Sequence, residues 1–154
     1  MSSAWATLLM TDHETTEKVF DAVQRALGAP EGPSPAVLRD ALDYFQNYVD
    51  ACHNKKEENH LFPLVEQRGI PRTGGPLAVM LGEHDQSRSL LPQLVEAGEA
   101  YLAGDGTVLP RLRELFHQYS TLLSNHFWKE NDILYPMARR VMNEADDEAV
   151  VDGI

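Results

Sequence analysis

The segment HNKKEENHLFP at residues 53–63 recurs as HFWKENDILYP at residues 126–136, 73 positions further along the chain. Both copies follow the pattern His-x3-Glu-x3-Leu-aromatic-Pro. In a helix, residues four positions apart lie on the same face, one turn from each other. Each copy therefore predicts an imidazole and a carboxylate side by side on one helical face, where the pair can bind a metal ion.

A shorter repeat accompanies the first one. Asp12-His13 is followed 71 positions later by Glu83-His84, again an acidic residue directly before a histidine. Because the two spacings agree to within two residues, the chain consists of two similar halves, each with a His and then a His-x3-Glu. Repeated helix pairs of this kind predict a pseudo-symmetric bundle.

Turn-forming residues divide the chain into four helical segments. Ser34-Pro35 is typical of a helix start, and glycines interrupt the pattern near residues 69–75 and 104–106. The predicted helices span 4–28, 35–67, 76–103 and 107–143, and we expect local kinks or ends at Pro63, Pro92 and Pro136. Short breaks without an alternating strand pattern predict an all-α, up-down-up-down antiparallel four-helix bundle.

The length and composition suit one domain with its own core. The chain has 154 residues, of which 43% are hydrophobic. We expect a single domain over residues 1–154 with the bundle at about 4–143. The acidic residues of segment 144–154 predict a frayed tail.

The charge balance argues against several partners. With 24 acidic and 13 basic residues, the formal net charge is -11, which disfavours nucleic acid and anionic membrane surfaces. No apolar run approaches a membrane span, and the N-terminus lacks the features of a signal peptide. The single cysteine, Cys52, excludes an internal disulfide. These features predict a cytoplasmic protein in a reducing setting.

Polar residues interrupt the apolar stripe of each predicted helix. A stripe followed in steps of three and four contains a histidine in all four helices and a glutamate in two of them. Unpaired carboxylates and imidazoles are costly to bury, and no Lys or Arg lies on these stripes. Two cations would satisfy the whole set, which favours iron, manganese or zinc. The candidate metal ligands are His13, His53, Glu57, His84, His126 and Glu130.

Other polar residues near these positions have weaker patterns. Asp12 and Glu83 precede candidate ligands and could orient neighbouring groups. Glu58 and Lys56 lie off the stripe and are predicted to be solvated, as is His117. His60 lies on the stripe about one turn beyond the site. We predict that Cys52 is a small core residue and not a ligand. We also predict core packing for four further side chains, with walling the pocket as the alternative for Met10 and Met80 and supplying a phenol as the alternative for Tyr48 and Tyr119.

With these motifs in place, residues 6–142 resemble the hemerythrin-like family, also called the HHE cation-binding domain. The resemblance implies a bundle around a non-haem di-iron centre, with two iron ions and an oxo or hydroxo bridge. It also implies that the four histidines are terminal ligands and that Glu57 and Glu130 bridge the metals.

The chain departs from the invertebrate oxygen carriers of this family at two positions. Those proteins have His-x3-His on the third helix, where this chain has Met80 one turn before His84. They also have His-x4-Asp on the fourth helix, where this chain has His126-x3-Glu130. One iron would thus have one histidine fewer, and solvent, His60, Tyr48 or Glu83 could fill the vacancy. The pattern is closer to bacterial HHE domains.

The resemblance predicts a protein that binds or senses O2 or NO at an open iron position. The alternatives are a di-iron enzyme consuming peroxide or O2, an iron-handling or repair protein, and a bundle whose core His and Glu pair without metal. Bacterial repair proteins of the family carry a cysteine-containing N-terminal segment that is not seen here, so we do not expect that role to be inherited directly.

Overall fold

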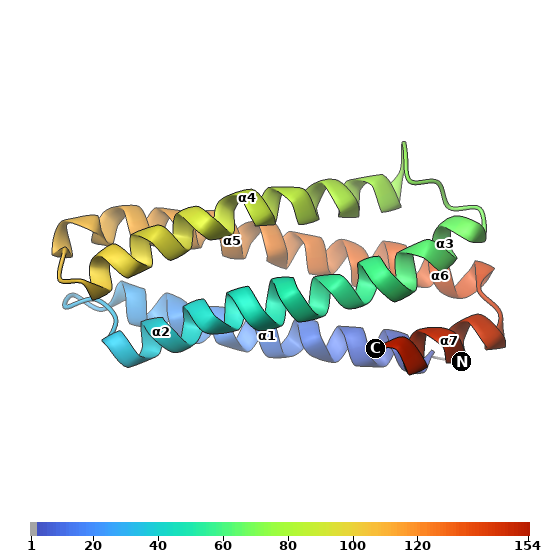
Figure 1. Ribbon diagram of the computed structural model, residues 1–154, viewed down its shortest axis with the longest axis horizontal. Coiled ribbons are helices and arrows are strands. Elements are labelled where there is room, and N and C mark those ends of the chain that lie inside the picture. The colour runs from blue at the N-terminus through green and yellow to red at the C-terminus, as the bar shows by residue number, and fades with distance from the viewer. Residues whose placement is uncertain (1–2) are drawn as a thin grey trace.

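Four long helical arms run antiparallel in the computed structural model, which describes residues 3–154 (Figure 1). The predicted four-helix bundle is confirmed, and the described residues contain no strand. The first arm is α1 (Ala4–Gly28) and the third is α4 (Pro76–Leu102). The second arm consists of α2 (Pro35–Asp43), η1 (Tyr44–Asn54), η2 (Glu57–Leu61) and α3 (Phe62–Gln67). The fourth consists of η3 (Gly106–Val108), α5 (Leu109–Lys129), η4 (Glu130–Leu134) and α6 (Tyr135–Val141).

The arms begin where the local sequence favours a helix start. The Ser34 hydroxyl accepts a hydrogen bond from the Val37 amide, and Pro35 occupies the first turn of α2. Gly74 and Gly75 precede α4 with φ values of 64° and 132°, which side chains other than glycine rarely adopt. These local signals explain why the predicted boundaries lie close to the observed ones.

The helical arms do not end at the three prolines, and the predicted kinks stay a prediction. Pro63 and Pro136 lie in the first turns of α3 and α6, directly after the wider π-helical turns of η2 and η4. There the amides of Phe62 and Tyr135 donate to the carbonyls five residues earlier, in Glu57 and Glu130. A widened turn is a natural response to a missing proline N–H. The arms continue past both prolines, and α4 continues past Pro92.

The core has two apolar parts with a polar layer between them. The hairpin-end core lies beneath the loops that join α1 to α2 and α4 to α5, and includes Leu27, Phe45, Leu94 and Phe116. The terminal-end core lies near the chain ends and includes Trp5, Leu61, Leu77 and Tyr135. The buried polar residues lie between them along each arm.

The prediction of a frayed acidic tail is wrong. Residues 144–153 form a helix, α7 (Glu144–Gly153), which begins with a capping box at Asn143. Asp146 of α7 accepts two hydrogen bonds from Arg68, at 2.7 and 2.8 Å. The sequence did not reveal this partner, because Arg68 is 78 residues away.

α7 covers one groove of the bundle, beside α1 and η2. The Trp5 indole donates to Asp147 at 2.8 Å, and Val150 is completely buried. The equivalent groove of the second half, between α4 and η4, has no such cover within the described chain. There Trp128 is 58% exposed and Ile133 39% exposed.

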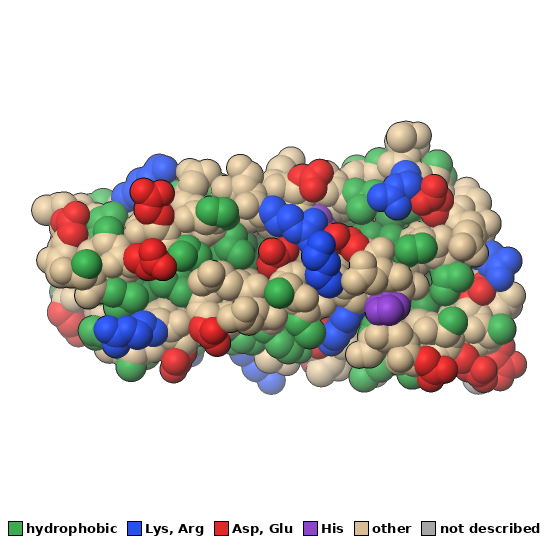
Figure 2. Space-filling model, in the orientation of Figure 1, with side chains coloured by type: hydrophobic (Ala, Val, Ile, Leu, Met, Phe, Trp, Pro, Cys, Tyr) green, Lys and Arg blue, Asp and Glu red, His purple; other side chains and the backbone are tan. Residues whose placement is uncertain are grey.

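No helix within residues 3–154 is both long enough and apolar enough to cross a bilayer. Figure 2 shows basic side chains lying among acidic ones midway along one face of the bundle. The extent of the domain, 1–154, stays a prediction.

Candidate metal centre

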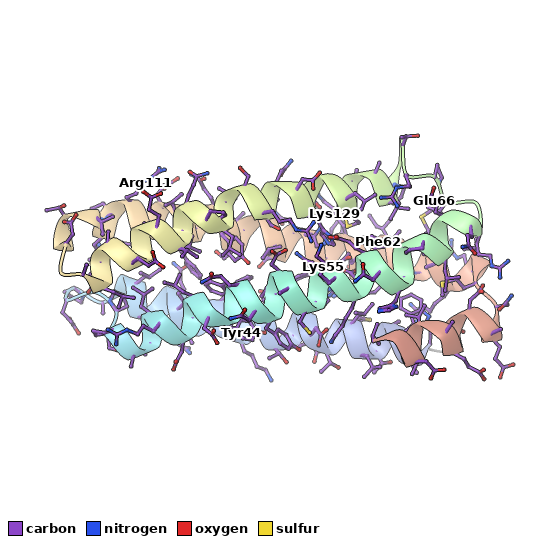
Figure 3. All side chains as sticks on the ribbon, viewed as in Figure 1. Tyr44, Lys55, Phe62, Glu66, Arg111 and Lys129 are labelled. Atoms are coloured by element: carbon purple, nitrogen blue, oxygen red, sulfur yellow. The ribbon has the colours of Figure 1, made fainter. Side chains whose placement is uncertain are left out.

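All six predicted ligands meet in the polar layer of the core. Each is exposed by 2% or less, and their donor atoms form two overlapping groups that could each hold a cation. They come from all four arms: His13 from α1, His53 from η1, Glu57 from η2, His84 from α4, His126 from α5 and Glu130 from η4. The side chains of Phe62 and Lys129, labelled in Figure 3, mark this region of the bundle.

The four histidines form two pairs. The Nε2 atoms of His13 and His53 are 3.2 Å apart, and the rings of His84 and His126 lie with their centroids 4.9 Å apart. Two nitrogens bound to one cation at about 2.1 Å lie roughly 3.0–3.4 Å from each other. The first pair therefore has the separation of two ligands on one metal ion.

Each glutamate lies between one histidine of each pair. Glu57 Oε1 is 3.4 Å from His53 Nε2 and 3.5 Å from His84 Nε2. Glu130 Oε1 is 3.1 Å from both His13 Nε2 and His126 Nε2. Both carboxylates thus span the two histidine pairs, as groups that join two cations would.

Asp12 directly precedes the ligand His13, and Glu83 directly precedes the ligand His84, but each accepts a hydrogen bond from a different histidine of the centre. His53 Nδ1 donates to Asp12 at 2.9 Å, and His126 Nδ1 donates to Glu83 at 3.1 Å. A proton on Nδ1 leaves the Nε2 lone pair free to face the site, which is how ligating histidines are usually oriented. The structure confirms the prediction that Asp12 and Glu83 orient neighbouring groups, since each is hydrogen-bonded to a histidine of the centre.

A lysine stands behind each of these carboxylates. Lys56 Nζ lies 3.1 Å from Asp12, and Lys129 Nζ lies 2.7 Å from Glu83. The prediction that Lys56 is solvated is wrong, because its side chain is only 22% exposed and is part of this network. Since the acidic partner is 44 residues away in the chain, the local pattern could not reveal it.

The other two histidines have different outer partners. His84 Nδ1 donates to Glu58 at 2.7 Å, and Arg88 contacts the same Glu58 oxygen at 2.6 Å. His13 Nδ1 donates instead to the Asn131 side-chain oxygen at 2.8 Å. The prediction that Glu58 is solvated is therefore wrong, and Asn131 was not anticipated.

Several buried ligand atoms lack a hydrogen-bond partner. They are Oε1 of Glu57, both carboxylate oxygens of Glu130, and Nε2 of His84 and His126. Buried polar atoms are nearly always paired or bound to metal, and unpaired ones are costly. These atoms converge with lone pairs facing inward, so the donor set fits cations in the centre.

The electrostatics of the centre also favour positive charge there. Burial lowers the pKa of His53, but the carboxylates of Asp12 and Glu57 outweigh burial and raise the pKa to about 10. His126 behaves alike: burial is outweighed by Glu130 and Glu83, and its pKa is raised to about 10. Without a metal, protons would supply the missing positive charge. A bound cation would replace those protons.

Tyr135 is part of the centre although the sequence did not single it out. Its hydroxyl donates to Glu57 Oε2 at 2.7 Å and lies 3.4 Å from His13 Nε2. Burial, together with Glu130 and Glu57, raises its pKa well above the ordinary value, so the phenol stays protonated. The aromatic position of the repeat was the available signal, since Phe62 holds the same place in the first copy.

The residues considered for a vacant ligand position lie elsewhere. Tyr48 donates to Asp12 at 2.6 Å, outside the donor groups, and Glu83 holds His126. His60 lies under Gly153 of α7, where a Cβ would collide with its ring.

His117 is exposed, as predicted. Met80 and Tyr119 are core residues, whereas Met10 and Cys52 are only partly buried.

A helical bundle with four histidines and two glutamates at its centre defines a class of buried cation-binding domains. The sequence profile of the Hemerythrin HHE cation binding domain matches residues 6–138, so the chain belongs to this family.

The chain is similar to several curated proteins, two of which are named for iron-sulfur cluster repair. The chain is 32% identical over 125 residues to the iron-sulfur cluster repair protein YtfE of Edwardsiella ictaluri, covering 79% of this chain and 53% of that protein. It is 34% identical over 86 residues to the iron-sulfur cluster repair protein DnrN of Neisseria gonorrhoeae, covering 54% of each. An uncharacterized protein of Mycobacterium tuberculosis is 22% identical over 142 residues, 90% of this chain and 54% of that protein. The chain thus spans about half the length of the curated relatives it matches.

Proposed function

We propose that the chain holds two iron ions in this centre and binds a small diatomic ligand, O2 or NO, at one of them. The observation that carries this proposal is the inequality of the two donor groups. One consists of Glu57, His84, His126 and Glu130, and the other of only His13, His53 and Glu130. Glu57 approaches this second group only through its Oε1, 3.4 Å from His53 Nε2. The group is therefore close to the two-histidine, one-carboxylate donor set with which non-haem Fe(II) proteins keep coordination positions open.

Iron is supported by the donors and by the family. Imidazole and carboxylate together suit iron, and two of the relatives are iron-sulfur cluster repair proteins. When bound, iron would supply redox chemistry and an open coordination position. Glu57 and Glu130 would join the two ions.

The surrounding residues would hold the ligands and exclude water. The ring of His13 stacks on Phe127, with centroids 4.3 Å apart, and lies 5.7 Å from the Tyr135 ring. Asp12 keeps Nδ1 of His53 protonated and Glu83 keeps Nδ1 of His126 protonated, so that Nε2 of each ring would face the metal. A buried site of this kind strengthens the interactions of the chain with charge inside it.

The test is metal content together with the ultraviolet-visible spectrum of the aerobic protein, followed by O2 and NO titrations. Two irons per chain and a spectrum that changes reversibly with either gas support the proposal. One zinc per chain with a featureless spectrum contradicts it. Rapid turnover of hydrogen peroxide by the iron-loaded protein would place it among the enzymes instead. His117→Ala, at an exposed position, is the matched control and should leave every readout unchanged.

Iron delivery in cluster repair is the second candidate, and the names of two relatives favour it. It predicts that the loaded protein loses iron to an iron-sulfur apoprotein faster than to solvent. A binding protein should instead retain both ions through cycles of gas binding. Transfer measured with and without the acceptor separates the two functions.

A further inference from the structure

The two glutamates of the centre differ in how much of each carboxylate is free. Both oxygens of Glu130 lack a hydrogen-bond partner, whereas Glu57 has only Oε1 free. Oε2 of Glu57 accepts a hydrogen bond from the hydroxyl of Tyr135 at 2.7 Å. The otherwise matched bridging positions are therefore unequal before any metal binds.

Tyr135 is held in place on several sides. It is completely buried and lies in the first turn of α6, next to Pro136. Its ring meets Trp5 edge-on, with centroids 5.4 Å apart, and is nearly parallel to the ring of His13. A phenol packed this way has little freedom to move its hydroxyl away from Glu57.

The first half offers no equivalent donor. Phe62 holds the same place in the repeat, and its ring lies 5.6 Å from that of His84. Phe62 has no hydroxyl, and within residues 3–154 no side chain donates to either oxygen of Glu130. The phenol is thus present on one side of the pseudo-symmetric centre and absent on the other.

We infer that Tyr135 is a positioning residue that makes the two metal positions unequal. By holding Oε2 of Glu57, it restricts this carboxylate to one oxygen and keeps the position at His13 and His53 incompletely coordinated. The hydroxyl lies 3.4 Å from His13 Nε2, on the side of that same position. This inference rests on the proposed two-metal function and adds which position stays open, and why.

The test is a Co2+ titration of the metal-free protein, followed by visible absorbance and calorimetry. The wild type should bind two Co2+ in two separate steps, with the weaker step at the position of His13 and His53. Tyr135→Phe frees Glu57 Oε2 for the second ion, so the second step should tighten by roughly tenfold or more, on the scale of one hydrogen bond to a charged group. The d–d absorbance of the second ion should also change, because its coordination number rises.

Tyr119→Phe is the matched control. Tyr119 is 1% exposed and packs in the hairpin-end core, so the variant loses a buried hydroxyl without touching the ligands. It should titrate like the wild type. Thermal melts of both metal-free variants establish that they are folded.

The outcomes separate the inference from the function beneath it. If the wild type and Tyr135→Phe both bind two Co2+ with the same ratio of affinities and the same spectra, the role of Tyr135 is overturned and the two-metal site stands. If the wild type binds fewer than two Co2+, the two-metal function itself fails. Equal, tight steps in the wild type would also overturn the inference.

Discussion

The two halves of the chain have the same inner frame but different surroundings. In each half a carboxylate before one histidine holds a second histidine and is backed by a lysine: Asp12 with Lys56 and Glu83 with Lys129. The differences lie around this frame. Glu58 is matched by Asn131, Phe62 by Tyr135, and α7 covers only the groove of the first half. The repeated frame accounts for cation binding, and the unmatched residues account for the inequality of its two positions.

The largest effect is expected from removing a glutamate of the centre. Glu57→Ala or Glu130→Ala leaves buried imidazoles and the other carboxylate without a shared partner, a loss of roughly 3–5 kcal/mol for a broken buried pair. Metal content and stability should fall together. Glu130→Ala should cost more, because Glu130 belongs to both donor groups. Metal analysis and denaturant unfolding measure both effects, and two metals retained in Glu57→Ala would contradict its bridging role.

The two grooves should differ in their tolerance of charge. Val150 of α7 is completely buried, so Val150→Asp should destabilise the protein by roughly 2–4 kcal/mol through an unpaired carboxyl group. Ile133→Asp, in the uncovered groove, should change stability by less than about 0.5 kcal/mol. Similar losses in urea unfolding for both variants would show that the second groove is covered as well.

The metal-free protein should lose stability as the pH rises. The pKa of His53 and of His126 is raised to about 10 in the fold, from an ordinary value of 6.5. The stabilisation from their protonation is fully present below pH 6.5 and is lost as the pH rises through 10, by at most about 1.4 kcal/mol per pH unit for each group.

The metal-loaded protein should lack this dependence, because the cation replaces the protons. Urea unfolding at pH 7 and pH 9, with and without chelator, compares the two forms. If the free energy of unfolding changed equally between pH 7 and pH 9 with and without chelator, the imidazoles would not face the metal. Since the two histidines belong to opposite halves, this measurement tests what the halves share.

A smaller effect is expected from the outer carboxylates. Asp12→Asn and Glu83→Gln should each weaken metal binding by roughly 10- to 100-fold, because the histidine that each holds becomes a poorer ligand. If the halves are equivalent here, the two losses should be similar in a Zn2+ competition assay. Glu66→Gln, at an exposed ion pair with Arg72, is the control and should have no effect. A large loss in only one half would restrict the equivalence of the halves to the six predicted metal ligands.

The sequence determined the features that depend on local spacing. Helix ends followed from caps, glycines and prolines, and the centre followed from His-x3-Glu, since residues four apart share a helical face. All six predicted ligand positions meet in the core for this reason, because each lies on the stripe that the core must bury.

Only the tertiary structure decided the contacts between distant segments. Glu58 and Lys56 resemble solvated surface residues until the packing of the arms brings His84 and Asp12 next to them. The acidic segment after residue 143 forms a helix because Arg68 and Trp5 meet it there, and Tyr135 reaches Glu57 across 78 positions of chain. Charge and hydrogen bonding depend on distance in space, and spacing along one helix carries no information about what another helix presents.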